Sequence, residues 1–578
     1  MTGRSIHLIV ISALVGVCPA GCRHLVLTPR PEFSHVVQGS VYMVASDHPL
    51  ASRAGASILA RGGNAVDAAV ATSLALGVAR PESTGIGGGG FMMLKRRGEV
   101  PRVLDYRETA PGACRPDAYL DKNGKRIQSR SVRGPWAVGV PGLLRGLSMA
   151  LADYGTMSLA EVIQPAIELA ENGVVVDAYT HSALERVASQ FSRDSELAGD
   201  FGELPRIFLR SGRVPAVGST MRQPELARTL RAIARDGAET FYTGEISRRI
   251  IAEIQGRGGP MTAEDLATYS VQVRAPLIGS YRGYTVAAMP PPSAGGACLI
   301  QMLNVLEGFD LQRLAPGPRH HVLVEAMKHA YADRSAYLGD ADALPGITND
   351  VARMIAMETA ASIRASIDLS RTHRDPLHYG SVFAGGDAGT THYCVMDADG
   401  MVVSATETIN YAFGSFIVVP GTGIVLNNEL DDFTISDSPT NAYGLAYSKR
   451  NEIRPGRRPL SSMSPTLLLR GDDVVIATGA AGGQRIITAT LQAILQVVEL
   501  GADAGQAVAA PRVHHQWVPN RLYVDDGISE EIRQALRARG HDPVSFRYHS
   551  GVCQMIHVQD GVLYGVSDPR KGGQPAGR

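Results

Sequence analysis

The spacing of apolar residues changes character about two-thirds of the way along the chain. Before that point the spacing is mostly helical. Small apolar residues from Leu50 to Ala79 predict two closely packed helices, because Gly62-Gly63-Asn64 combines a glycine C-cap with an asparagine N-cap. The same helical period predicts helices from Cys298 to Leu306 and from Val322 to Leu338.

Beyond residue 390 the period shortens to that of β-strands. Alternating apolar and polar residues flank short turns rich in aspartate and glycine, which predicts two β-hairpins. The predicted strands are His392–Met396, Met401–Thr406, Leu467–Arg470 and Val474–Thr478. A helix is expected from Arg485 to Val498. Strands with helices on both sides indicate an α/β (α+β) fold in the form of a layered sandwich.

A glycine run from Gly85 to Gly90 formally satisfies the GxGxxG pattern of dinucleotide-binding sites. Such a site needs a strand before the glycines and a helix after them. Here a helix precedes the run and a strand, Phe91 to Lys95, follows it. The dinucleotide interpretation therefore fails, and crowding of the backbone explains the glycines better.

The composition is that of a globular protein with an ample core. The chain has 578 residues, of which 44% are hydrophobic and 19% are charged. Its formal net charge is +0, so no global field attracts nucleic acid or an anionic membrane. Basic residues form no stripe interleaved with aromatic ones, and a nucleic-acid partner is excluded on these grounds.

The N-terminus has the pattern of an export signal. Arg4 precedes an apolar run from Ile6 to Val17 that is shorter than a membrane span, and small residues follow it. We therefore predict a signal peptide over residues 1–22 and a periplasmic location. Cys22 ends a sequence similar to bacterial lipoprotein signals, which makes a lipid anchor possible, although Pro19 departs from that pattern. A buried N-terminal strand is the alternative.

Cysteines and histidines give no sign of a metal site. The remaining cysteines are widely spread and have no metal-ligand spacing, so isolated buried thiols are expected at Cys114, Cys298, Cys394 and Cys553. The pairs His320-His321 and His514-His515 are adjacent in sequence, so neither presents two imidazoles on one helix face. We predict neither a metal nor another cofactor.

Thr390 stands where a polar, glycine-rich segment becomes an alternating strand. A threonine hydroxyl is a weak nucleophile and needs a nearby base. An α-amine can serve as that base, since its pKa is about 7.7–8.0, but Thr390 has a free amine only after cleavage of its bond to Gly389. Taken alone, the Thr-Thr-His-Tyr sequence is more typical of an ordinary β-strand than of a catalytic site, because threonine and tyrosine favour strands.

Several blocks along nearly the whole chain resemble, in the same order, the γ-glutamyltranspeptidase family. They are Gly63–Ala69, the glycine run to Phe91, Asp105–Pro111, Pro290–Gly296, Gly389–Val395, Thr408–Asn410, Asn427–Asp432, Arg458–Pro465, Thr478–Gly483, His514–Trp517 and Ser567–Pro569. The resemblance implies the four-layer αββα sandwich of N-terminal-nucleophile hydrolases. It also implies a precursor that cuts itself into a large subunit, residues 23–389, and a small catalytic subunit, residues 390–578, which stay together as a heterodimer.

The resemblance assigns catalytic roles to matching positions. Thr390 is implied to be the nucleophile, and cleavage is implied to fall between Gly389 and Thr390. Thr408 matches the threonine that positions the nucleophile. Gly482 and Gly483 match the glycines whose backbone amides form an oxyanion hole, where the absence of side chains lets two N–H groups approach one charge. Ala480-Ala481 departs from the residues that relatives often have before this pair, which could loosen the turn.

The implied substrate is a γ-glutamyl group, which has an α-carboxylate and an α-ammonium. Arg107 matches the arginine that meets the carboxylate, and its planar fork suits a bidentate contact. Ser461 and Ser462 match hydroxyls that bind the same carboxylate. Taken singly, Arg107 is more typical of a surface ion pair.

Acceptors and negative charge are implied around the α-ammonium, at Asn410, Glu429 and Asp432. Glu429 stands where some relatives have glutamine. The segment between Asp432 and Arg458 resembles a lid loop, with Tyr443 as the aromatic residue that closes the pocket.

These residues imply a self-processing γ-glutamyltransferase or glutathione hydrolase. It would pass a γ-glutamyl group from glutathione or a related amide to water, an amino acid or a peptide. One alternative is a related acylase that cleaves glutaryl side chains, as cephalosporin acylases do, and that has no need of acceptors for an ammonium. The other is an unprocessed, non-catalytic surface protein, which would remain a single chain. For Cys394, no histidine or asparagine partner is evident in the sequence, so a core position is expected.

Overall fold

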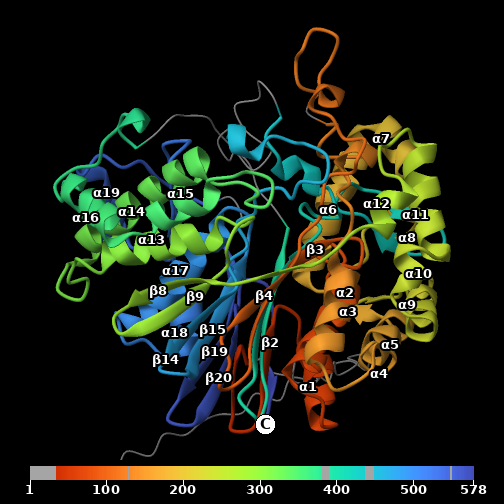
Figure 1. The fold of residues 1–578 in the computed structure, drawn as a ribbon, viewed down its shortest axis with the longest axis horizontal. Helices are drawn as coiled ribbons and strands as arrows, with labels where there is room; N and C mark the ends of the chain where they lie inside the picture. Colours follow the sequence, from red (N-terminus) through yellow and green to blue (C-terminus); the bar gives the residue numbers. More distant parts are fainter. Residues whose placement is uncertain (1–33, 128, 380–388, 436–447, 547–549) are drawn as a thin grey trace, which may run out of the picture. The chain divides into compact units, whose positions relative to one another are not determined.

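The structure is a computed structural model that describes residues 34–127, 129–379, 389–435, 448–546 and 550–578. The elements described below belong to one unit, His35–Arg578. Its centre consists of two seven-stranded sheets stacked face to face, with helices against both outer faces (Figure 1). The predicted four-layer αββα sandwich is therefore confirmed.

The first sheet is antiparallel throughout and combines strands from distant parts of the chain. Across the sheet its strands are β1 (Val36–Gly39), β20 (Val562–Ser567), β19 (Val552–Gln559), β15 (Asp473–Ala481), β14 (Thr466–Arg470), β9 (Tyr284–Ala288) and β8 (Leu277–Tyr281).

The second sheet is also antiparallel and contains the predicted hairpin after Thr390. Across the sheet its strands are β21 (Ala576–Gly577), β2 (Met43–Ser46), β10 (Thr391–Met396), β11 (Val402–Thr408), β3 (Gly89–Lys95), β4 (Arg102–Tyr106) and β7 (Gln272–Arg274). Both sheets thus combine strands from before Gly389 with strands from after it, so this position is not a boundary between folding domains.

Strand β10 shows how the sheet divides the core. Successive side chains of a strand point to opposite faces. Tyr393 and Val395 accordingly belong to the hydrophobic cluster that contains helix α2 (Ala65–Ala79), whereas Cys394 and Met396 belong to the cluster shared with the first sheet. Both clusters are extensive, so the two faces of the strand are fully buried.

Helices form the two outer layers (Figure 1). Those near the second sheet are α1 (Pro49–Ala60), α2, α3 (Leu143–Tyr154), α5 (Gln164–Asn172) and α9 (Pro224–Asp236). Those near the first sheet are α13 (Gly295–Leu306), α14 (Pro316–Tyr337), α17 (Arg485–Val498) and α18 (Ala504–Ala509). The short turn between α1 and α2 ends at Asn64, whose side chain accepts hydrogen bonds from Val66 N and Asp67 N, as the predicted N-cap requires.

The other described elements are shorter or more peripheral. The helices are α4 (Leu159–Val162), α6 (Ala178–Arg193), α7 (Ser195–Asp200), α8 (Glu203–Phe208), α10 (Glu239–Tyr242), α11 (Glu245–Gly256), α12 (Ala263–Ala267), α15 (Ile347–Met354), α16 (Met357–Ser366) and α19 (Glu530–Ala538). Small sheets contain β5 (Val174–Val175), β6 (Thr220–Met221), β12 (Val418–Val419), β13 (Ile424–Val425), β16 (Val513–His514), β17 (Leu522–Val524) and β18 (Pro543–Ser545).

Within the described part of the chain, no helix is both long and apolar enough to cross a membrane. The four cysteines expected as isolated thiols are all free and buried. The predicted signal peptide, including Cys22, lies outside the described residues, as does Tyr443 of the predicted lid.

Candidate functional site

Thr390 lies immediately before β10, and its hydroxyl contacts the peptide group that precedes it. Thr390 Oγ1 donates a hydrogen bond to Gly389 O at 2.5 Å. Thr408 Oγ1 lies 3.3 Å from Thr390 Oγ1 and donates to the same carbonyl oxygen at 3.0 Å. The backbone N–H of Asn410 donates to Thr408 Oγ1 at 2.8 Å. Thr408 Oγ1 is thus an acceptor toward Asn410, and its hydroxyl proton is directed at Gly389 O.

The hairpin register brings these two threonines together. Thr391 pairs with Glu407 across β10 and β11, so the next positions outward, Thr390 and Thr408, are opposite each other. Strand β3 lies on the other side of β11, and a Cβ atom on Gly88 would lie 2.2 Å from Thr408 O. The glycine run therefore lets its backbone approach another segment closely, as the sequence indicated. The segment that it approaches at Gly88 is the end of β11.

A pocket of about 300 Å³ opens beside Thr390 and contains most of the predicted site. Nine predicted residues line it: Arg107, Thr390, Thr408, Asn410, Glu429, Asp432, Ser461, Ser462 and Gly483. Three further lining residues were not predicted: Met463, Gln484 and Ile486. Met463 and Gln484 each directly follow a predicted position, and Ile486 lies three residues after Gly483, so the neighbouring blocks contained the only available signal.

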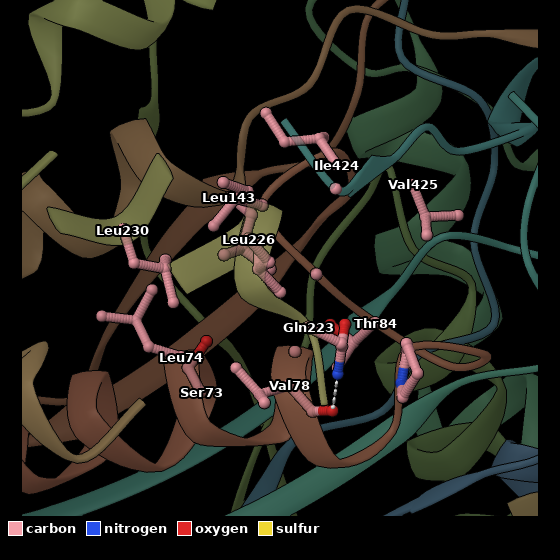
Figure 2. A pocket seen from close by; sticks show the side chains of 15 residues that line it. Ser73, Leu74, Val78, Thr84, Leu143, Gln223, Leu226, Leu230, Ile424 and Val425 are labelled. Atoms are coloured by element: carbon pink, nitrogen blue, oxygen red, sulfur yellow. Dashed lines mark hydrogen bonds between the residues drawn. The ribbon is translucent and has the colours of Figure 1, made fainter. Parts of the chain in front are cut away.

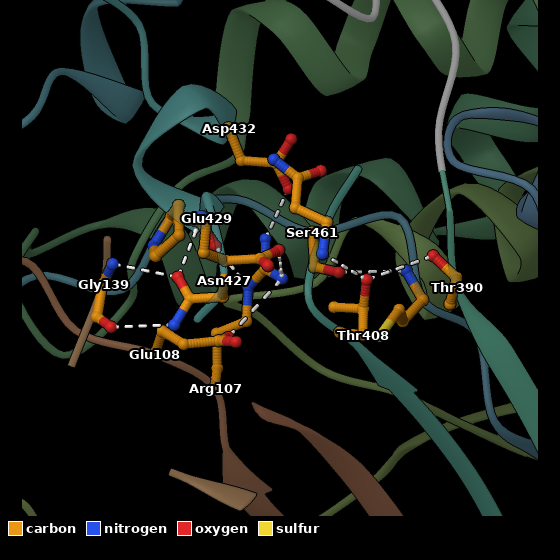
Figure 3. Close-up of polar contacts among 12 residues, drawn as sticks. Arg107, Glu108, Gly139, Thr390, Thr408, Asn427, Glu429, Asp432 and Ser461 are labelled. Carbon is orange, nitrogen blue, oxygen red and sulfur yellow. Dashed lines mark hydrogen bonds and ion pairs between the residues drawn. The ribbon is translucent and has the colours of Figure 1, made fainter. Parts of the chain in front are cut away.

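Arg107 lies at the opposite end of the pocket from Thr390, and its guanidinium contacts two carboxyl groups (Figure 3). Its Nη1 atom donates to Glu429 Oε1, and its Nη2 atom donates to Asp432 Oδ2 at 2.5 Å. Nε donates to Pro459 O at 3.2 Å. The arginine predicted to meet a substrate carboxylate is thus held in place by the two acidic residues predicted to meet the ammonium.

Burial dominates the electrostatics at this end. It raises the pKa of Glu429 to about 8; Arg107 opposes that shift and Asp432 adds to it. Burial also raises the pKa of Asp432, with Arg107 in opposition. For Arg107, burial alone would lower the pKa, but Glu429 and Asp432 outweigh it and the net shift is upward, so the guanidinium stays charged. Glu108, a buried neighbour that sequence reasoning missed, has its pKa raised well above the usual range by burial and then by Glu429.

Polar atoms at the pocket without a hydrogen-bond partner among the described residues include Ser462 Oγ and Glu429 Oε2. The adjacent Ser461 is fixed by the proline-glycine turn, since its N–H donates to Pro292 O at 2.8 Å and its carbonyl accepts from Ala294 N at 2.9 Å. The rigid backbone around Ser461 thus presents an unpartnered hydroxyl at the next residue, where a polar ligand could bind.

Gly482 and Gly483 connect β15 to helix α17. Their φ angles are +131° and +59°, in the region that favours glycine. Gly483 O accepts from Ile486 N at 3.1 Å and so begins the helix. A helix N-terminus carries partial positive charge, which suits a developing negative charge. Ala480 and Ala481 are buried within β15 and precede the turn.

Sequence reasoning missed a buried lysine beside Thr390. Lys571 Nζ donates to Thr390 O at 2.9 Å and to Ser83 Oγ at 3.1 Å, and it lies 2.5 Å from Asp47 Oδ2. The only signal for it was its position two residues after the Ser567–Pro569 block.

Cys394 does have a histidine neighbour, contrary to the expectation from sequence. Its Sγ atom lies 3.4 Å from His392 Nε2, because alternate residues of β10 share a face. Burial raises the pKa of the Cys394 thiol and lowers that of His392 to about 3, so both groups stay neutral at pH 7. The expected core position of Cys394 is confirmed.

One described group has ligand atoms close enough for a metal ion: His321, Glu325 and His541, whose atoms lie within 4.8 Å of one another. His321 and Glu325 lie one turn apart on α14, and His541 follows α19, so neither adjacent histidine pair supplies both of its imidazoles. His321 Nδ1 and His541 Nε2 are hydrogen-bonded at 2.8 Å, and Lys328 Nζ donates to Glu325 Oε1 at 3.1 Å. The lysine cation already neutralises the carboxylate, so this is a hydrogen-bonded network.

A second pocket, of about 420 Å³, lies beside α2 and α9 (Figure 2). Its walls are mainly apolar, with Leu74, Leu226 and Leu230 among them. The amide of Gln223 donates to Val78 O at 2.7 Å and is therefore committed to the backbone. The pocket brings no set of nucleophile, base and charged groups together, unlike the pocket at Thr390.

Comparisons with known proteins agree with this arrangement. A sequence profile of the gamma-glutamyltranspeptidase family matches residues 51–578. The glutathione hydrolase proenzyme of Escherichia coli K12 is 39% identical over 558 residues, which cover 94% of this chain and 94% of that protein. The acylase ACY 1 proenzyme of Pseudomonas sp. strain SE83 is 39% identical over 549 residues, which cover 93% of each.

Solved structures show the same relationship. The cephalosporin acylase of Bacillus halodurans superposes with a TM-score of 0.83 at 30% identity, covering 95% of this chain and 98% of that one. The gamma-glutamyltranspeptidase of Helicobacter pylori has a TM-score of 0.52 at 40% identity, covering 57% of this chain and 92% of that one. The fold is that of the N-terminal-nucleophile hydrolases. Within that class, the chain belongs to the γ-glutamyltranspeptidase family of enzymes.

Proposed function

We propose that the chain is a self-processing γ-glutamyltransferase or glutathione hydrolase in which Thr390 is the nucleophile of both self-cleavage and turnover. One observation supports this most strongly. The hydroxyl of Thr390 contacts the Gly389 carbonyl group and also faces a pocket whose far end contains Arg107, Glu429 and Asp432. One atom is therefore placed for attack on its own chain and on a substrate.

In self-cleavage, Thr390 Oγ1 attacks the carbonyl carbon of Gly389. A C–O bond forms and the C–N bond breaks, which gives an ester and transfers the hydroxyl proton to the departing amine. Thr408 donates to Gly389 O, so it stabilises the negative charge that develops there. Water then hydrolyses the ester, leaving a carboxylate on Gly389 and a free α-amine and hydroxyl on Thr390.

The freed amine acts as the base in turnover. It accepts the Thr390 hydroxyl proton while Oγ1 attacks the γ-carbonyl carbon of the substrate, and the backbone amides of Gly482 and Gly483 hold the oxyanion. The proton passes to the leaving amine as the amide bond breaks. Water, or the amine of an amino acid or peptide, then takes the γ-glutamyl group from the ester and regenerates Thr390.

The substrate carboxylate would bind Arg107 together with the serine pair, including the unpartnered Ser462 hydroxyl. The substrate ammonium would bind Asn410, Glu429 and Asp432. Because Arg107 already contacts both acidic residues, the incoming zwitterion completes an alternating array of charges. This array favours glutathione or another γ-glutamyl amide as the substrate.

The acylases among the relatives support a second candidate, cleavage of a glutaryl amide. A glutaryl group has the carboxylate but lacks the ammonium. It would leave Glu429 and Asp432 without a cationic partner from the ligand, which costs free energy for buried carboxylates. We therefore expect kcat/KM to be higher for γ-glutamyl than for glutaryl anilides, and the reverse order would favour the acylase.

The proposed products are a large subunit ending at Gly389 and a small subunit, residues 390–578. Because strands from both fragments are neighbours in both sheets, the fragments would remain a heterodimer after cleavage. Closure by Tyr443, export to the periplasm and lipid attachment at Cys22 remain predictions from the sequence.

The test is the intact mass of purified wild type, Thr390→Ala and Thr390→Ser, together with turnover of a γ-glutamyl anilide. Wild type should give two fragments, with Thr390 at the start of the smaller one, and should turn over the anilide. Thr390→Ala should remain one chain without turnover. Thr390→Ser keeps the hydroxyl and should still cleave. An uncut, inactive wild type would favour the non-catalytic alternative.

A further inference from the structure

The C-terminal segment of the chain places a buried cation against the residue that precedes β10. Strand β21 pairs with β2, which in turn pairs with β10. Lys571, just before β21, donates from Nζ to Thr390 O at 2.9 Å. The lysine is 2% exposed. Neither self-cleavage nor turnover as described above uses this side chain.

Lys571 keeps its positive charge. Burial is the largest single effect and would lower the pKa of its ammonium, but the Asp47 carboxylate and Tyr179 together outweigh it and the net shift is upward. The backbone of Lys571 is fixed as well, since Arg80 Nη2 donates to Lys571 O at 2.7 Å and to Asp47 O at 3.1 Å. The ammonium therefore stands at a defined place beside Thr390.

Other titratable groups face this lysine from three directions. They are Asp47 and His48 at the start of α1, Arg80 and Glu82 after α2, and Asp177 and Tyr179 at the start of α6. Arg80 is paired with Asp177 at 2.7 Å, and burial lowers the pKa of His48 to about 3, so that imidazole is neutral at pH 7. Among the described residues, Lys571 is the cation that contacts Thr390 directly.

We propose that Lys571 positions Thr390 and keeps the α-amine released by cleavage in its free-base form at neutral pH. This inference rests on the proposed function, in which that amine is the base. The hydrogen bond to Thr390 O fixes the peptide plane that follows the nucleophile, and hence the directions of its amine and hydroxyl.

The charge of Lys571 supplies the second effect. An unperturbed α-amine has a pKa of about 7.7–8.0, so at pH 7 most of it is protonated and cannot accept the hydroxyl proton. The Lys571 ammonium is hydrogen-bonded to the carbonyl oxygen of Thr390, and this nearby positive charge disfavours a second positive charge on the Thr390 amine. Lys571 thereby increases the fraction of enzyme that is ready to react.

The experiment is the pH profile of kcat/KM for a γ-glutamyl anilide in wild type and Lys571→Gln. Glutamine can still donate to Thr390 O but has no charge. The acid limb should move to higher pH by about one unit, while activity on the alkaline plateau stays close to that of wild type. Lys571→Arg keeps the charge, and its acid limb should coincide with that of wild type.

Lys95→Gln is the matched control. Lys95 is also 2% exposed and pairs with an aspartate, Asp472, at 2.9 Å. It lies at the end of β3 opposite to Gly89, which pairs with Thr408. Losing this buried lysine should leave the acid limb in place, so a shift in Lys571→Gln cannot be assigned to a general loss of stability.

A profile of Lys571→Gln that superimposes on that of active wild type would overturn the inference and leave the proposed function intact. Failure of wild type to cleave or turn over would instead overturn the proposed function. If Lys571→Gln does not fold, the pH dependence of acetylation of the Thr390 amine in cleaved wild type gives the answer. Its midpoint should lie below about 7.7, and a midpoint at or above the ordinary range would contradict the inference.

Discussion

Thr408 Oγ1 donates a hydrogen bond to the carbonyl oxygen of Gly389 at 3.0 Å, from the strand beside the one that Thr390 immediately precedes. Its own acceptor site is occupied by Asn410 N at 2.8 Å. The direction of the Thr408 hydroxyl is therefore set by the backbone, and its proton points at the peptide bond proposed to break. A donor fixed before reaction needs no reorganisation when charge develops on the carbonyl oxygen.

Replacing Thr408 by valine should slow self-cleavage by about 10²–10³-fold, the usual cost of losing one oxyanion donor. Valine keeps the β-branched shape, so the strand should be retained. Thr408→Ser restores the hydroxyl and should cleave at a rate near that of wild type. The rate is followed by intact mass after rapid purification, and cleavage of Thr408→Val at the wild-type rate would exclude a role for this donor.

Gly483→Ala should reduce turnover far more than it reduces stability. At φ +59° an alanine costs about 1–2 kcal/mol, and a displaced oxyanion turn can lower kcat by about 10²-fold. Gly471→Ala is the control, because Gly471 has φ +63° in a hairpin turn and a Cβ atom there meets nothing within 4 Å. Both variants should lose similar unfolding free energy, whereas equal losses of kcat would contradict the assignment.

The elements around the site were largely predictable because they depend on local pattern. The expected strands His392–Met396 and Met401–Thr406 differ from β10 and β11 by one or two residues at their ends. Helix α17 has the predicted bounds, Arg485–Val498. In contrast, α14 begins at Pro316, six residues before the predicted start at Val322, because proline is favourable in the first helical turn.

The contacts that decide the electrostatics were not predictable from local pattern. Lys571 and Thr390 are 181 residues apart in sequence, and His321 and His541 are 220 apart. Only the order of strands in the sheet brings the C-terminal segment beside β10. The resemblance to a family suggested that Arg107 lies in the pocket. That its guanidinium contacts the carboxyl groups of Glu429 and Asp432 became visible only in the fold.

Arg107→Lys should raise KM for a γ-glutamyl anilide by about 10- to 100-fold, since a charge-assisted hydrogen bond contributes about 1.5–3 kcal/mol and an ammonium cannot replace the planar fork. Arg107→Ala should also destabilise the fold by about 3–5 kcal/mol, because Glu429 and Asp432 lose their buried partner. Denaturant unfolding measures this cost. Arg102→Lys, on the exposed end of β4, is the control and should change neither quantity.

Glu429 should make ligand affinity depend on pH. Its carboxyl has a pKa raised by burial from 4.5 to about 8, so the folded protein holds a proton that the unfolded chain has lost over this range. Its contribution to stability is therefore complete below pH 4.5 and declines as pH rises toward 8. A bound α-ammonium favours the carboxylate and releases that proton. L-glutamate should consequently bind more tightly at pH 8 than at pH 6.

Isothermal titration with L-glutamate in two buffers of different ionisation enthalpy measures both the affinity and the proton release. Glu429→Gln keeps an acceptor but cannot titrate, so its affinity should vary less between these pH values and its binding should release fewer protons. Asp432 remains in that variant, and since burial also raises its pKa, some dependence should persist. Equal proton release by wild type and Glu429→Gln would place the titrating group elsewhere in the pocket.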